Sequence, residues 1–150
     1  MANKVNLENE IASVEEIEAA YKDAPLNLIE KELEKVEDII KEKQGHLERF
    51  NALKTLSETN EFKTLFDKGY FEEEKNRVTE LIVGTQVESG NVEYIKRDVL
   101  QNLTDKLLSM RNLKIYFSAV VMNGQSAEIE LEELNRIKSV LEKKIKFGGK

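Results

Sequence analysis

Pro25 is the only proline among 150 residues, and on both sides of it apolar side chains recur every three or four positions. This spacing marks one face of an α-helix, whereas a half-buried strand would alternate at every second residue. Charged residues make up 35% of the chain and glycine occupies only 7 positions, a composition that favours long solvated helices over a turn-rich β-sandwich or barrel. The sequence therefore predicts an all-α fold, an elongated bundle of about five helices with one or two long ones.

The N-terminal half is expected to contain a short helix and a long one. Ser13 and Glu16 have the spacing of a capping box, which starts a helix, and Pro25 ends this segment. The next helix is expected over residues 26–57, with a coiled-coil-like apolar stripe at heptad spacing. The stripe consists of Leu26, Leu33, Ile40 and Leu47 together with Ile29, Val36 and Phe50.

This long helix raises the question of what covers its stripe. If residues 26–57 are continuous, the helix is about 48 Å long, which exceeds the roughly 40 Å diameter of a compact chain of this size. We therefore expect the seven stripe residues to contact a second copy or another protein. The alternative is a monomeric bundle, in which the helix kinks at Gly45 and folds its stripe against residues 92–122.

Further helices are expected in the rest of the chain. Their boundaries follow from candidate caps and from glycines that would end a helix. They are residues 59–69, 71–84, 91–124 and 126–147, with residues 85–90 as a polar loop. We expect residues 1–150 to form a single domain, with residues 1–57 as an N-terminal helical extension and residues 58–147 as the helical core.

The sequence contains no recognisable catalytic or metal-binding motif. The absence of cysteine excludes disulfides, thiolate zinc sites and cysteine nucleophiles. His46 is the single histidine, so no second one completes a metal site, and the acids at positions 72–74 would point about 100° apart around a helix. No glycine-rich loop has the phosphate-binding ending. We therefore expect no catalytic residue, no cofactor, no metal and no enzymatic activity.

Charge is distributed unevenly along the chain. Residues 1–50 sum to −6, residues 51–100 to −3 and residues 101–150 to +3. The overall −6 argues against a nucleic-acid binder, because that affinity comes mainly from neutralising phosphates. The exception is a basic tail, which could touch nucleic acid or simply suit a helix C-terminus, and which consists of Lys143, Lys144, Lys146 and Lys150.

Hydropathy argues against a membrane protein. The longest nearly uncharged apolar stretch, residues 115–122, is far shorter than the roughly 20 residues needed to span a bilayer. The first residues are too acidic for a signal peptide. We expect a soluble protein that binds neither a membrane nor a small-molecule substrate.

A structural corner is predicted at Gly69. Glycine readily adopts the positive φ that ends a helix abruptly, and Phe71 could then return to the core beside Phe62 and Phe66. Arg77 is part of the same prediction, because its fixed fork of donors suits either the C-terminus of a preceding helix or a carboxylate such as that of Glu74 or Asp67.

Tyr70 lies next to this corner and is the residue of the segment that we favour for contact with a partner. Aromatic side chains dominate the energetics of protein interfaces. An exposed Tyr70 ring would therefore be a candidate anchor.

The same segment resembles a known family. The positions that carry the resemblance are Gly69, Tyr70, Phe71, Glu74, Arg77 and Val78, followed by Asn123-Gly124 and Ala127-Glu128. This pattern is similar to that of small helical proteins encoded by tailed bacteriophages, over roughly residues 60–130. Genes of that family tend to lie among virion and head-assembly genes, so the resemblance implies a structural or assembly role.

Two functions are compatible with these features. The first is a non-enzymatic phage structural or assembly protein, either a virion or capsid component or a head-assembly factor, that contacts itself or other virion proteins. The alternative is a phage effector that binds and inhibits a host protein, with its acidic N-terminal half imitating the charge of nucleic acid. Opposite charge at the two ends favours the first, because it can steer copies together. The expected location is the virion or the host cytoplasm.

Overall fold

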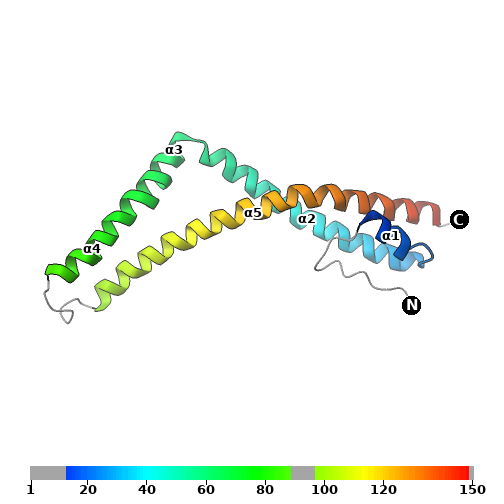
Figure 1. Cartoon of the computed structure of the whole chain (residues 1–150). Helices are drawn as coiled ribbons and strands as arrows, with labels where there is room; N and C mark the ends of the chain where they lie inside the picture. Colours follow the sequence, from blue (N-terminus) through cyan, green and yellow to red (C-terminus); the bar gives the residue numbers. More distant parts are fainter. Residues whose placement is uncertain (1–12, 89–96, 149–150) are drawn as a thin grey trace. The chain divides into compact units, whose positions relative to one another are not determined.

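The computed structural model describes residues 13–88 and 97–148, and the regular structure in these ranges is helical (Figure 1). The elements are α1 (Val14–Ala20), α2 (Leu26–Ser57), α3 (Asn60–Phe62), a π-helix η1 (Lys63–Glu74), α4 (Lys75–Glu88) and α5 (Arg97–Gly148). α2 has 32 residues and α5 has 52, which corresponds to about 48 and 78 Å. The predicted all-α fold with one or two long helices is confirmed.

The expectations for the N-terminal half are accurate at the level of helix boundaries. The Ser13 hydroxyl accepts a hydrogen bond from the Glu16 N–H at 3.3 Å, and the Ser13 N–H donates to the Glu16 carboxylate at 2.9 Å. α1 ends before Pro25, and α2 begins directly after it. Gly45 lies inside an unbroken α2, so the helix is not interrupted there.

Three predicted helix ends are wrong. Residues 60–88 are helical without a break, so the chain passes through Gly69 and Gly84. α5 continues through Asn123 and Gly124, and Ser126 therefore caps no helix. Residues 85–88 of the expected loop are helical, whereas residues 89–90 and the proposed cap Asn91 lie outside the described residues. A glycine inside a helix costs only about 1 kcal/mol relative to alanine, which the packing of long helices can outweigh.

The chain divides into two compact units. Unit 1 consists of Met1–Asn51 and Met122–Lys150, and unit 2 consists of Ala52–Val121. α2 and α5 each contribute one segment to unit 1 and one segment to unit 2. Unit 1 thus combines residues from both sides of the boundary expected at residue 57.

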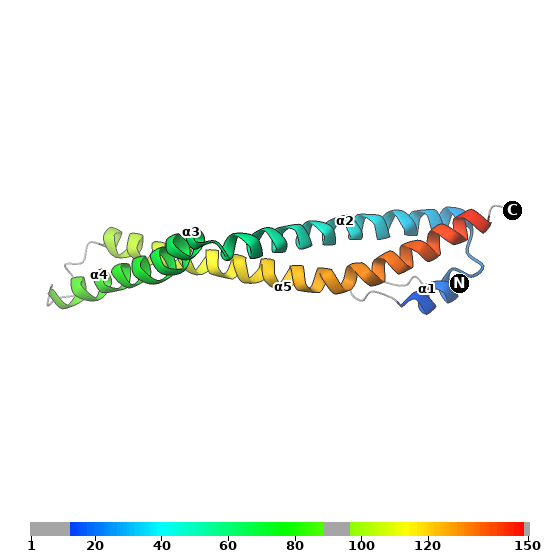
Figure 2. The ribbon, with the colours of Figure 1, turned by 90° about the horizontal axis from the view of Figure 1, so that it is seen from above.

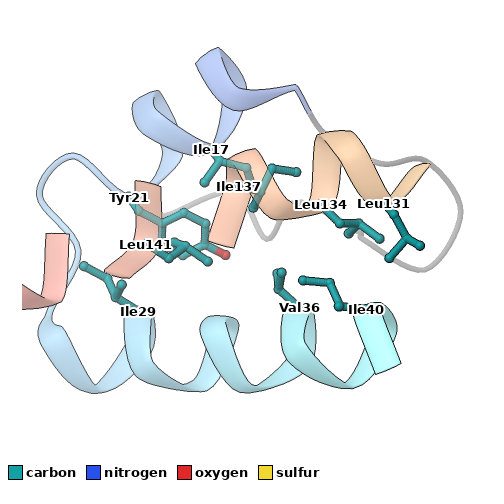
Figure 3. Close-up of a cluster of buried hydrophobic side chains, with 9 residues drawn as sticks. All are labelled: Ile17, Tyr21, Ile29, Val36, Ile40, Leu131, Leu134, Ile137 and Leu141. Carbon is teal, nitrogen blue, oxygen red and sulfur yellow. The ribbon is translucent and has the colours of Figure 1, made fainter. Parts of the chain in front are cut away.

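The core of unit 1 is formed by α1, the first part of α2 and the last part of α5, which lie side by side (Figures 1 and 2). Figure 3 shows its buried side chains, which are Ile17, Tyr21, Ile29, Val36, Ile40, Leu131, Leu134, Ile137 and Leu141. The buried apolar residues of α2, which are Ile29, Val36 and Ile40, are members of the predicted heptad stripe. Burying each such aliphatic side chain contributes roughly 1.5–3 kcal/mol, so this cluster fixes α2 against α5.

Polar groups at the edge of this core hold the helices in register. Glu32 is only 5% exposed, and its carboxylate interacts with the Tyr21 hydroxyl and, at 3.3 Å, with the Lys35 ammonium group. Burial, followed by the charge and the hydrogen bond of Glu32, raises the pKa of Tyr21 to about 12. Lys43, which interrupts the apolar stripe in the sequence, forms an ion pair with Glu130 of α5.

Candidate partner-binding surface

Unit 2 contains an aromatic cluster, defined here as Phe62, Phe66, Tyr70, Phe71, Tyr116 and Phe117. Three ring centroids surround that of Phe117 in α5, at 5.8 Å (Phe62), 6.3 Å (Phe66) and 6.2 Å (Phe71). The Tyr70 ring lies 5.3 Å from Phe71, and the Tyr116 ring lies 6.1 Å from Phe117. Aromatic pairs attract one another at centroid separations of roughly 4.5–7 Å, so the six rings form one continuous network.

The π-helix explains how residues nine positions apart reach the same ring. An α-helix completes a turn in about 3.6 residues, so Phe71 would point away from the side that Phe62 occupies. η1 has the longer hydrogen-bonding step of a π-helix and winds more slowly. The slower winding returns Phe71 to the side of Phe62, and both contact Phe117. π-helical turns are frequent at functional sites.

The aromatic cluster is only partly shielded from solvent. Phe62 is buried, Phe66, Tyr70, Phe71 and Phe117 are half-buried, and Tyr116 is 55% exposed. The chain neighbours Leu65 and Ile115 are 66% and 54% exposed. Large apolar groups that gather at a surface in this way are typical of interaction sites.

Charged groups adjoin the aromatic cluster. The Arg77 guanidinium donates from Nε and Nη2 to the Glu74 carboxylate at 2.8 and 2.6 Å, which confirms the predicted pairing with Glu74. The hydrogen bond from Arg77 lowers the pKa of Glu74. The Lys114 ammonium nitrogen lies 5.6 Å from the centroid of Phe71, within the range of a cation–π interaction. The surface therefore combines apolar rings with fixed charges at its edge.

The predicted corner at Gly69 does not form. Gly69 lies inside η1 with a right-handed backbone, so the left-handed cap is a wrong prediction. A different constraint applies at this position, because an added Cβ would lie 2.9 Å from the Thr64 carbonyl oxygen. Phe71 nevertheless packs against Phe66, as expected, with 6.4 Å between the ring centroids. The π-helix, instead of a corner, brings the two rings together.

The stripe residues of α2 that were predicted to contact a partner are mostly used within unit 1. Those in or against its core are Ile29, Val36 and Ile40, which are buried, and Leu33 and Leu47, which are partly buried. They face residues 131–141 of α5 rather than residues 92–122. Leu26 remains 36% exposed, and Phe50 lies over Gly124. The expectation that this stripe faces a partner is therefore wrong for its buried members.

His46 lies among charged neighbours of its own helix. Its Nδ1 is 3.0 Å from Arg49 Nη2, and its Nε2 is 3.5 Å from the Glu42 carboxylate. Within residues 13–88 and 97–148, no group of three or more histidines, aspartates or glutamates is arranged to hold a metal ion. In the same ranges, no helix is both long enough and apolar enough to cross a membrane.

The basic tail makes contacts within unit 1. Lys144 Nζ donates to the Glu18 carbonyl oxygen at 3.4 Å, and Lys146 Nζ lies 6.0 Å from the Phe147 ring centroid. Lys143 is exposed, and Lys150 lies outside the described residues.

The sequence interpretation named Phe62, Phe66, Tyr70 and Phe71, but it missed the contribution of Tyr116 and Phe117 to this surface. The sequence does contain one signal of an exposed apolar surface, which is the run Ile115-Tyr116-Phe117 in α5. Consecutive residues on a helix point about 100° apart, so these three large side chains cannot all face the same neighbouring helix. Phe117 takes the inward position, and the other two are exposed.

No family model, no curated protein and no solved structure matches the chain. The candidate surface therefore rests on the geometry of unit 2.

Proposed function

We propose that this chain is a non-enzymatic protein that acts through helical contacts with other proteins, and that the aromatic cluster of unit 2 is its contact surface. The observation that carries the proposal is the combination of ordered rings with partial exposure. Rings that already pack on one another lose little conformational freedom on binding, and aromatic anchors supply much of the energy of interfaces. Tyr116 and Tyr70 add hydroxyl groups that can hydrogen-bond to a partner.

Within this class, the proposed role is that of a phage structural or assembly protein, a virion or capsid component or a head-assembly factor. Its support is the resemblance of the Gly69–Val78 segment to a family of tailed bacteriophages. Tyr70 and Phe71 of that segment belong to the aromatic cluster, and Arg77 forms the adjoining ion pair with Glu74. Two of the residues that carry the resemblance, Tyr70 and Phe71, are thus also residues of the proposed contact surface. The proposed location is the virion or the host cytoplasm.

Site-specific photo-crosslinking tests this function directly. A photoreactive residue replaces Tyr116, and crosslinked products are identified by mass spectrometry in purified particles and in the lysate of the producing cells. The matched control carries the same residue at Ile129 in unit 1, which is 76% exposed. The proposal expects virion proteins or further copies of this chain at position 116 in excess of the control. Equal, nonspecific labelling at both positions would contradict it, and a host protein captured at position 116 would favour the effector alternative.

A further inference from the structure

Unit 2 exposes more large apolar side chains than it buries. Among its described residues four are buried, namely Phe62, Val78, Met110 and Val120. Eight are exposed, namely Leu56, Leu65, Leu81, Val83, Val99, Leu108, Ile115 and Tyr116. The described residues of unit 1 show the reverse, with nine large apolar side chains buried and four exposed. Small helical units are stabilised chiefly by their buried apolar side chains, so unit 2 has an incomplete core that a further surface would complete.

The two helical stretches of unit 2 carry opposite charge. The acidic arm, residues 60–88, has seven acidic and four basic residues, a net −3. The basic arm, residues 97–121, has four basic and two acidic residues, a net +2, and it has no acidic residue after Asp105. Exposed charges are present on both, including Glu72 and Glu80 on the acidic arm and Arg111 on the basic arm. A second unit 2 therefore offers to each arm a helix of the opposite sign.

We infer that unit 2 associates with unit 2 of a second copy of this chain, so that four helices form one bundle and the acidic arm of each copy lies beside the basic arm of the other. A twofold axis uses the same surface on both copies, which forms the acidic–basic pairing twice. A different protein that offers a single amphipathic helix, whether acidic or basic, would be complementary in charge to only one of the two arms. Four-helix bundles bury the apolar stripes that a pair of helices leaves open. This inference rests on the proposed function and names the partner at the same surface.

The first test replaces exposed apolar residues. Leu108 and Ile115 are 48% and 54% exposed, so the double variant Leu108→Glu, Ile115→Glu leaves the fold of the single chain intact. Sedimentation of the full chain is expected to show a dimer for the wild type. The affinity of the variant is expected to be at least about a hundredfold lower, because each copy loses two apolar contacts. Circular dichroism checks that both remain helical. The matched control, Met122→Glu with Ile129→Glu, changes two exposed residues of α5 in unit 1, at 68% and 76% exposure, and is expected to remain a dimer.

The second test reverses charge on one arm at a time. Lys106→Glu with Arg111→Glu makes both arms acidic, and Glu72→Lys with Glu80→Lys makes the acidic arm basic. Each charge-reversed variant alone is expected to dissociate, whereas an equimolar mixture of the two is expected to form a heterodimer. Added salt is expected to weaken the wild-type dimer, because exposed charges are screened.

The outcomes separate this inference from the proposed function. A wild type that sediments as a monomer at every soluble concentration overturns self-association, while crosslinking of Tyr116 to another protein would still support the contact function. A dimer that survives the unit 2 variants but is lost in the unit 1 control overturns the location. Failure of the mixed charge variants to associate overturns the pairing of arms.

Discussion

Gly124 of α5 lies directly against Phe50 of α2, so closely that a side chain at position 124 would overlap the Cβ and Cγ atoms of Phe50. Gly124 is buried and lies one heptad before Leu131 of the core, which places it on the seam between the two helices. A glycine here allows the large ring of Phe50 to occupy the space that a second side chain would need. The Asn123-Gly124 pair that predicted a helix end is thus a packing position inside a continuous helix.

We expect Gly124→Ala to destabilise the protein, by about 1–3 kcal/mol, because overpacking of this size forces helices or side chains to shift. The gain in helix propensity, about 1 kcal/mol at most, reduces but does not reverse the loss. Gly45→Ala is the matched control, since the nearest atom to an added Cβ is Arg49 Nη1 at an ordinary 3.6 Å. Thermal and urea unfolding should show opposite signs for the two substitutions. Equal stabilisation by both would mean that Phe50 does not contact Gly124.

Gly69→Ala is expected to destabilise the π-helix. Its Cβ would press on the Thr64 carbonyl oxygen, which is backbone and cannot swing aside. The cost should be roughly 1 kcal/mol or more, and near-ultraviolet circular dichroism should change as Phe71 moves relative to Phe117. Gly84→Ala in α4 provides the comparison, because nothing lies within 4 Å of an added Cβ there. If both variants melt alike and keep the aromatic signal, the π-helical contact is not a constraint.

The sequence predicted most accurately where one local signal determines the structure. The capping box at Ser13 and the position of Pro25 set the start of α1 and of α2, because both act within a single turn. The predictions for the glycines were wrong because no local signal determines the structure around them. Gly69 and Gly124 look like helix ends in the sequence, yet their role depends on Thr64 in the π-helix and on Phe50 of a distant segment. Neither neighbour is apparent from spacing along the chain.

The candidate surface shows the same limit. The heptad stripe of α2 was recognised from its spacing, but spacing does not say which helix covers it, and the last part of α5 does so. The aromatic cluster depends on the π-helix, since an α-helical reading places Phe62 and Phe71 on opposite sides. Of the partners that the sequence offered for Arg77, the structure has Glu74, which lies three residues earlier in the chain.

We expect the stability of unit 1 to fall in alkaline solution through Tyr21. Its pKa is raised from 10 in the unfolded chain to about 12 in the folded protein, so folding favours the protonated phenol. This contribution is fully present below pH 10 and is lost as the pH rises towards 12. The free energy of unfolding, measured with urea at a series of pH values, should therefore decline more steeply over this window in the wild type than in Tyr21→Phe.

The Tyr21→Phe variant also loses the hydrogen bond to the nearly buried Glu32. Below pH 10 it should therefore be less stable than the wild type, by roughly 1–3 kcal/mol, since a buried acceptor is left without its partner. Glu32→Gln keeps an acceptor but removes the charge that helps to raise the pKa of Tyr21, so the alkaline decline should still begin near pH 10 but end at a lower pH and be smaller than in the wild type. An identical pH profile in all three proteins would show that Tyr21 and Glu32 do not interact.

The double variant Leu33→Glu, Ile40→Glu decides whether the α2 stripe is an internal core or an intermolecular seam. Ile40 is buried and Leu33 packs against the same cluster, so we expect unit 1 to unfold, with a loss exceeding about 3 kcal/mol from the deleted apolar contacts and the buried charge. Helicity should fall, and cooperative melting of unit 1 should disappear. The exposed substitution Ile129→Glu introduces the same charge in unit 1 and should change stability by no more than about 0.5 kcal/mol. A double variant that stays fully helical and merely dissociates from an oligomer would contradict the internal core and return the α2 stripe to a partner.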